Sequence, residues 1–98
     1  MNLSNTYELS EDIAYRVIDG EAMVLNLNDG EHYSLNGTGT EILELMARKK
    51  DLKFIISTMN KEYGIDNKVI EEDLIIFVKE LLTNKLISMT KGGEGTLN

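Results

Sequence analysis

The sequence predicts an α+β domain in which a three-stranded antiparallel sheet precedes three helices, in the order β-β-β-α-α-α. Short runs of β-branched and aromatic residues, separated by turn residues, occupy positions 13–35. Beyond position 36 the spacing of apolar residues changes from two to about 3.6, which is the period of a helix. The 98 residues, 42% of them hydrophobic, suit one domain with one core.

Turn residues divide the predicted sheet into its strands. Residues 13–18 and 22–27 are apolar runs joined by Asp19-Gly20, a pair that favours the two-residue turn of a hairpin. Asn28-Asp29-Gly30 then supplies residues that tolerate a positive φ. Residues 31–35 alternate polar and apolar side chains, as a half-buried strand does. The first third of the chain is therefore predicted to be a meander.

The first helix is predicted to run from the end of the sheet to about Arg48. Thr38 and Glu41 have the spacing of a capping box, in which each side chain accepts a hydrogen bond from a backbone N–H at the helix start. The apolar residues that follow share one face of the helix. They are Ile42, Leu43, Leu45 and Met46.

Two further helices are predicted after it. Asp51 has the position of an N-cap residue for the second helix, and Gly64 that of a left-handed residue at its end. Its predicted buried residues are Phe54, Ile55, Ile56 and Met59. Asp66 is expected to cap the third helix, which runs to about Asn84. Its apolar face comprises Ile70, Leu74, Phe77, Val78 and Leu81. Residues 86–89 are expected to form a short extended segment on the core.

The ends of the chain are predicted to lie outside the domain, which spans residues 13–89. Residues 1–12 are polar and acidic, lack the basic start and apolar run of a signal peptide, and are expected to be a flexible N-terminus. Residues 90–98 hold three glycines and are expected to be a disordered tail. No apolar stretch approaches the ~18 residues of a membrane span. We therefore expect a soluble, cytoplasmic protein.

Composition argues against several classes of function. Acidic residues outnumber basic ones by 17 to 10, so the chain carries a net charge of −7 and repels phosphate backbones. The chain has no cysteine, which excludes disulfides, thiolate nucleophiles and cysteine zinc sites, and His32 is its single histidine. No nucleophile stands with a base. The sequence therefore predicts a binding protein with no catalytic residue, metal or cofactor, and not an enzyme.

Two groups of residues carry a resemblance to a known family. The first comprises Val24-Leu25-Asn26-Leu27, Asn28-Asp29-Gly30, Tyr33-Ser34-Leu35-Asn36, Gly39 and Ile42-Leu43-Glu44-Leu45. The second comprises Tyr63-Gly64-Ile65-Asp66 and then Asp73, Phe77 and Leu81 at four-residue steps. In this combination and order, residues 10–89 resemble the family of the coenzyme PQQ synthesis protein D (PqqD). This family is the prototype of the recognition elements for ribosomally synthesised and post-translationally modified peptides (RiPP recognition elements). The turn Arg48-Lys49-Lys50-Asp51 lacks the glycine that relatives often have there.

The resemblance implies a winged helix-turn-helix domain that binds the leader of a ribosomally synthesised, post-translationally modified precursor peptide. The domain would present this precursor to a separate modifying enzyme, such as a radical SAM protein or a peptidase-cyclase pair. The leader would add as an antiparallel strand to the third strand and lie against the third helix. Neither nucleic acid nor a membrane is an implied partner.

The periods of the third strand and third helix identify residues suited to this role. If Tyr33 and Leu35 face the core, His32 and Ser34 point away, and the strand can offer its backbone to a peptide. Beside the core face of the third helix runs a stripe of apolar and acidic residues. The predicted peptide-binding residues are Glu31, His32, Tyr33, Ser34, Leu35, Val69, Asp73, Ile76, Phe77 and Glu80. The alternative is that the apolar members pack on neighbouring loops and the acids only solvate the helix.

Two other functions are compatible with the sequence. A winged helix domain can also be a DNA-binding regulator, because fold does not settle function. The charge of the third helix argues against this. A DNA-binding helix should be rich in Lys and Arg, whereas this segment holds four acidic residues beside Lys68, Lys79 and Lys85. The chain can also be a non-catalytic subunit that stabilises a larger enzyme.

Overall fold

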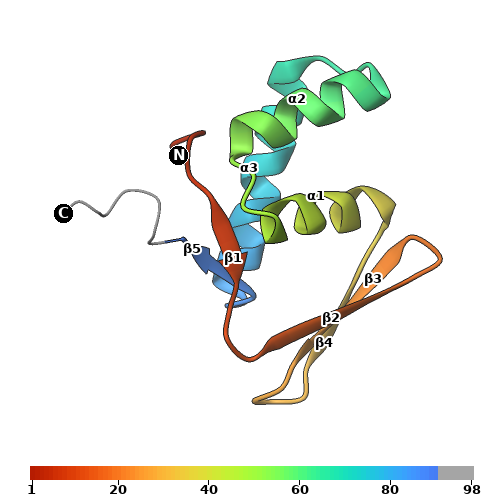
Figure 1. The fold of residues 1–98 in the computed structure, drawn as a ribbon, viewed down its shortest axis with the longest axis vertical. Helices are drawn as coiled ribbons and strands as arrows, with labels where there is room; N and C mark the ends of the chain where they lie inside the picture. Colours follow the sequence, from red (N-terminus) through yellow and green to blue (C-terminus); the bar gives the residue numbers. More distant parts are fainter. Residues whose placement is uncertain (91–98) are drawn as a thin grey trace.

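The computed structural model describes residues 1–90. Its elements are β1 (Tyr7–Leu9), β2 (Ile13–Ile18), β3 (Glu21–Asn26), β4 (His32–Leu35), α1 (Gly37–Ala47), α2 (Leu52–Tyr63), α3 (Asn67–Thr83) and β5 (Ile87–Met89). The sheet of β2, β3 and β4 lies on one side of α1, and α2 lies on the other (Figure 1). The predicted order of a three-stranded antiparallel sheet followed by three helices is confirmed.

The sheet has the strand order β2-β3-β4, with both pairs antiparallel. Asp19 and Gly20 both have positive φ, 53° and 79°, as a tight hairpin turn with the right-handed twist of the strands requires. Val24 is buried opposite Tyr33, whereas Met23 is exposed opposite Ser34. One face of the sheet therefore packs on the core and the other faces solvent, as the alternation of polar and apolar side chains at residues 31–35 predicts.

The core lies where the three helices meet the inner face of the sheet. The helices bury Ile42, Leu43, Met46, Leu52, Ile55, Ile56, Met59, Ile70, Leu74, Val78 and Leu81. The prediction that Phe54 is buried is wrong, because its side chain is 46% exposed. Phe54 lies in the first turn of α2, outside the apolar stripe that Ile55 and Met59 complete, and the Lys50 ammonium lies 4.8 Å from its ring centre.

Asn36 caps α1, and the predicted capping box of Thr38 and Glu41 is wrong. The helix begins at Gly37, and the Asn36 side chain accepts a hydrogen bond of 2.8 Å from the Gly39 N–H. Thr38 therefore lies inside the first turn, where its side chain cannot act as the N-cap. An asparagine is an equally good cap at this position, and it leaves the strand and the helix joined without a loop.

Both predicted cap residues of α2 are confirmed, whereas the predicted N-cap residue of α3 has the expected position without the expected hydrogen bond. Asp51 accepts a hydrogen bond of 2.8 Å from the Phe54 N–H, and Gly64 ends α2 with a φ of 67°. Asp66 occupies the N-cap position of α3, but its side chain makes no capping hydrogen bond.

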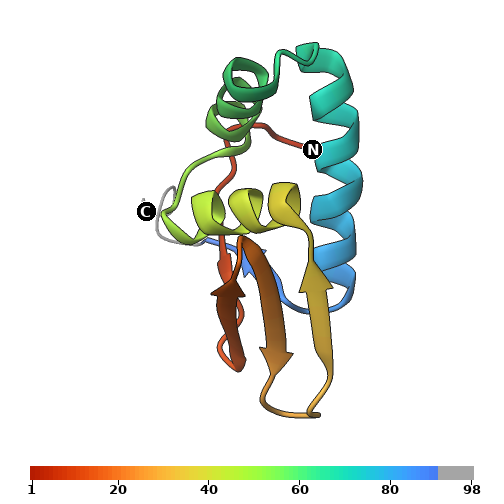
Figure 2. The ribbon, with the colours of Figure 1, turned by 90° about the vertical axis from the view of Figure 1, so that its right-hand side faces the viewer.

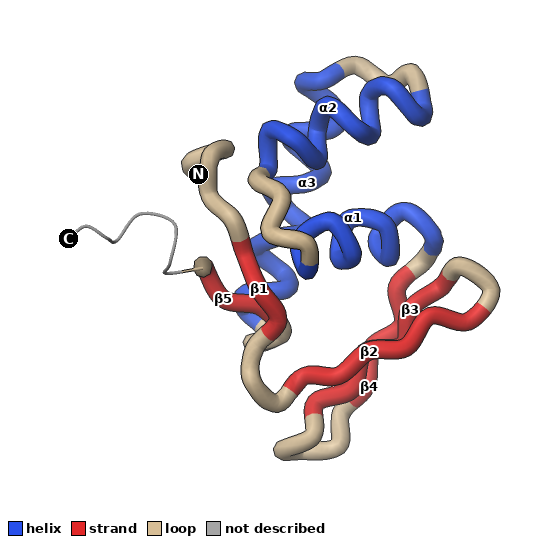
Figure 3. The backbone as a smooth tube through the Cα atoms, in the orientation of Figure 1, coloured by secondary structure: helices blue, strands red, loops and turns tan. Residues whose placement is uncertain are grey.

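The N-terminal segment forms a strand, so the prediction of a flexible N-terminus over residues 1–12 is wrong. β1 pairs with β5, with Tyr7 opposite Met89 and Leu9 opposite Ile87, and the two strands stand apart from the three-stranded sheet (Figure 3). The Tyr7 side chain is only 2% exposed. The extended segment expected at residues 86–89 is therefore the partner of β1. Of the tail predicted to be disordered, residues 90–98, Thr90 is described, and its N–H donates a hydrogen bond of 2.9 Å to the Thr6 carbonyl. Residues 91–98 lie outside the described residues.

Candidate functional site

A groove of about 510 Å³ lies between the end of β4 and the flank of α3. Figure 2 shows these two elements side by side, with α1 crossing beside them. Buried apolar side chains from all three helices form the floor of the groove. They are Ile42, Ile55, Met59, Ile70 and Leu74. The exposed rim on the helical side comprises Tyr63, Ile65, Val69, Asp73 and Glu80.

The edge of β4 that faces away from β3 has backbone groups available for another strand. The Asn26 N–H donates a hydrogen bond of 2.9 Å to the Glu31 carbonyl, which identifies these residues as a bonded pair. Because bonding direction alternates along an antiparallel strand, Tyr33 and Leu35 face β3, whereas His32 and Ser34 direct their N–H and C=O groups to the open edge. Within residues 1–90, β4 pairs only with β3.

Gly39 allows α1 to approach the aromatic ring at the centre of the groove. A Cβ atom at Gly39 would lie 3.4 Å from the Phe77 Cζ and 3.5 Å from the Leu35 Cβ. These distances are at the close limit of ordinary van der Waals contact, so a side chain larger than a methyl group has no room there. The half-buried Phe77 ring therefore fits closely between α1 and the end of β4, where it joins the strand side of the groove to the helical side.

The structure brings six of the ten predicted site residues together in the lining of the groove. They are Ser34, Leu35, Val69, Asp73, Phe77 and Glu80. The other four lie outside the lining. Glu31 and His32 are exposed at the start of β4, and Tyr33 turns toward the core. Ile76 is 59% exposed on the flank of α3 that adjoins Asp73.

Besides Asn36 and the buried floor, two parts of the groove are missing from the site predicted from the sequence. One is the start of α1, with Thr38 and Gly39, and the other is the connection between α2 and α3, with Tyr63 and Ile65. Tyr63 and Ile65 are exposed apolar residues on either side of the glycine that ends α2. Large apolar side chains exposed at a tight helix end are the signal that could have identified them.

Glu41 connects the rim of the groove to α1. The Tyr63 hydroxyl donates a hydrogen bond to a carboxylate oxygen of Glu41. This hydrogen bond raises the pKa of Tyr63, with smaller contributions from burial and the nearby negative charges. The pKa of Glu62 is also raised, first by a hydrogen bond with Glu41, then by burial and by repulsion from the Glu41 charge. The Glu41 carboxylate therefore interacts with two neighbours at the end of α2.

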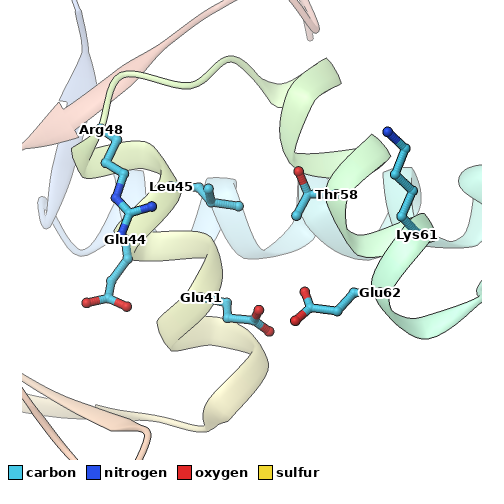
Figure 4. Close-up of a pocket in the computed structure, with 7 residues that line it drawn as sticks. All are labelled: Glu41, Glu44, Leu45, Arg48, Thr58, Lys61 and Glu62. Carbon is cyan, nitrogen blue, oxygen red and sulfur yellow. The ribbon is translucent and has the colours of Figure 1, made fainter.

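A second hollow, of about 550 Å³, lies between α1 and α2. It is lined by Glu41, Glu44, Leu45, Arg48, Thr58, Lys61 and Glu62, and the Glu41 and Glu62 carboxyl groups face one another across it (Figure 4). Five of its seven lining residues carry a charge, and none of the seven belongs to a strand. In the described part of the chain no three acidic or histidine side chains are arranged to hold a metal ion. The groove beside β4 is therefore the better candidate site.

Replacing Glu62 with Gln should change how stability depends on pH. An acid whose pKa is raised on folding stabilises the protein fully below its ordinary pKa of 4.5, and this stabilisation is lost as the pH rises through the raised value. We expect the wild type to gain melting temperature relative to E62Q as the pH falls from 7 to about 4. Thermal unfolding at several pH values measures this, with E11Q, a loop acid, as the control. Parallel profiles for E62Q and the wild type would contradict the interaction with Glu41.

None of the helices within residues 1–90 combines the length and apolarity needed to cross a membrane.

Comparison with known proteins identifies similar chains. The solved structure "TbiB1 in Complex with the TbiA(beta) Leader Peptide" is 26% identical with a TM-score of 0.79, and the match covers 93% of this chain and 99% of that one. The structure "Lasso peptide synthetase B1 complexed with the leader peptide" is 21% identical with a TM-score of 0.79, over 84% of this chain and 96% of that one. At this lower identity it shows a shared fold alone. A search of the curated proteins gives no match.

The family model for "Coenzyme PQQ synthesis protein D (PqqD)" matches residues 21–87, which include β3, β4, all three helices and the start of β5. These residues contain both groups of motifs on which the sequence resemblance depends. Because the match covers well over half of the chain, the predicted relationship is confirmed, and the protein belongs to the PqqD family.

Proposed function

We propose that the protein binds the leader of a ribosomally synthesised precursor peptide as an extended strand, in the groove between β4 and α3. The observation that carries this proposal is a strand edge that has no partner within residues 1–90 and lies directly beside an apolar groove. Membership of the PqqD family supports it, as does the similarity, at 26% identity, to TbiB1, which was solved with a leader peptide. The bound precursor is then presented to a separate modifying enzyme, of the radical SAM or the peptidase-cyclase kind.

The groove meets the physical needs of strand addition. An antiparallel peptide exchanges backbone hydrogen bonds with His32 and Ser34, which provides affinity without regard to peptide sequence. Alternate side chains of the peptide then point toward the groove, where apolar anchors contact Phe77 and Leu74. Among its described residues the lining holds no histidine, cysteine or lysine, so we expect binding without turnover.

Titration with leader peptides tests this proposal. Synthetic leaders of precursors encoded beside the gene are added to isotopically labelled protein, and the amide signals are followed. We expect shifts in β4 and α3, at residues 31–36 and 69–80, while signals of β2 change little. If none of the encoded leaders binds, the proposal is wrong.

Replacing Val69 with Asp should weaken leader binding about tenfold, because a charge on the apolar rim must lose its hydration when the peptide covers it. Val69 is 47% exposed, so the domain should remain folded. Phe54→Asp is the matched control, since Phe54 is 46% exposed, occupies the same position in the first turn of its helix and lies outside the groove. Calorimetric titration of both variants provides the comparison, and equal affinities would exclude Val69 from the site.

A further inference from the structure

The groove has an acidic rim with no intramolecular counter-charge in the described residues. Asp73 and Glu80 are the charged side chains of its lining. At three and four positions before and after Asp73, α3 carries only apolar side chains: Val69, Ile70, Ile76 and Phe77. Within residues 1–90 the single ion pair joins Lys49 and Glu8 at 3.3 Å, so neither rim acid is neutralised there.

The two acids are spaced to meet an extended peptide at two points. Asp73 and Glu80 are seven residues apart on α3, which places them on the same face with a separation of about 10 Å along the helix axis. An extended chain advances about 3.3 Å per residue, so this separation corresponds to roughly three residues of bound peptide. Because alternate side chains of a strand share a face, side chains two or four positions apart come within reach of both carboxylates.

We infer that the groove selects a basic extended peptide, whose Lys or Arg side chains two or four positions apart contact Asp73 and Glu80. This inference rests on the proposed function and specifies its ligand. Apolar side chains of the peptide occupy the floor, and the two cations fix its register along α3. Charge complementarity identifies the occupant, because the described residues of the lining include two acids and no lysine, arginine or histidine. The net charge of −7 attracts the same peptides from a distance.

Selection from a peptide library tests the inference even where the natural leader is unidentified. Random 16-residue peptides displayed on phage are selected on the whole chain, and the strongest binder is then synthesised. We expect Lys and Arg to be enriched in pairs two or four positions apart. D73N and E80Q should each weaken binding of this synthetic peptide about two- to fivefold, as exposed ion pairs do. E72Q is the matched control, since Glu72 is an exposed acid of α3 outside the groove.

A charge exchange gives a second readout. A Glu-containing version of the selected peptide should bind D73K more tightly than it binds the wild type. Selected peptides without enriched cations, or unchanged affinity in D73N and E80Q, would overturn the charge selection while leaving strand addition intact. Equal weakening in E72Q would also overturn it, by showing a general effect of net charge. Failure to select any peptide would contradict both the inference and the proposed function.

Discussion

Replacing Ser34 with Pro should weaken leader binding by about tenfold or more, equivalent to about 1.4 kcal/mol, while the domain stays folded. The Ser34 N–H faces the open edge of β4, so proline removes a donor that the peptide needs and places its ring in the path of the added strand. No backbone hydrogen bond to β3 is lost, only the long, exposed contact of 4.0 Å from the Ser34 hydroxyl to the Met23 sulfur, and proline is tolerated at such edge positions. Calorimetric titration with the leader measures the loss, and circular dichroism checks the fold.

The opposite edge of the sheet provides the control. In β2 the bonding direction alternates in the same way, so the Val17 N–H faces the free edge of that strand, far from α3. V17P should therefore disturb the sheet to a similar extent and leave leader binding unchanged. Equal loss in both variants would show that binding depends on the stability of the sheet and not on the edge of β4.

Replacing Tyr7 with Ala should destabilise the protein by about 3–5 kcal/mol, as the loss of a buried aromatic side chain does. Tyr7 belongs to the core cluster and holds β1 against β5 and α1. A loss of this size is a large part of the stability of a domain of this length. Urea unfolding followed by circular dichroism measures the change in the free energy of unfolding.

Glu8→Gln is the matched control in the same strand. It removes only the exposed ion pair with Lys49, so the expected change is below about 1 kcal/mol. If Y7A were as stable as E8Q, the N-terminal segment would not be packed on the core, and the flexible N-terminus expected from the sequence would be correct after all.

Six of the sixteen residues that line the candidate groove can be predicted from the sequence. The alternation of β4 and the helical period of α3 show which side chains share a face, and they identify Ser34, Leu35, Val69, Asp73 and Glu80. Tyr63, Ile65 and Gly39 cannot be identified in this way, because they enter the groove from other elements. Only the packing of α1 and α2 against α3 decides that these residues line the same hollow.

The sequence by itself determined the order and approximate bounds of the three-stranded sheet and the helices, because those features depend on neighbours within a few residues. Asp19-Gly20 directs a hairpin, and Gly64 ends a helix, through backbone preferences that act locally. Only the tertiary structure decided that Tyr7 is buried and that β1 pairs with β5. Those segments lie about eighty residues apart in the chain, and a three-residue strand is too short for its side-chain period to predict a distant partner.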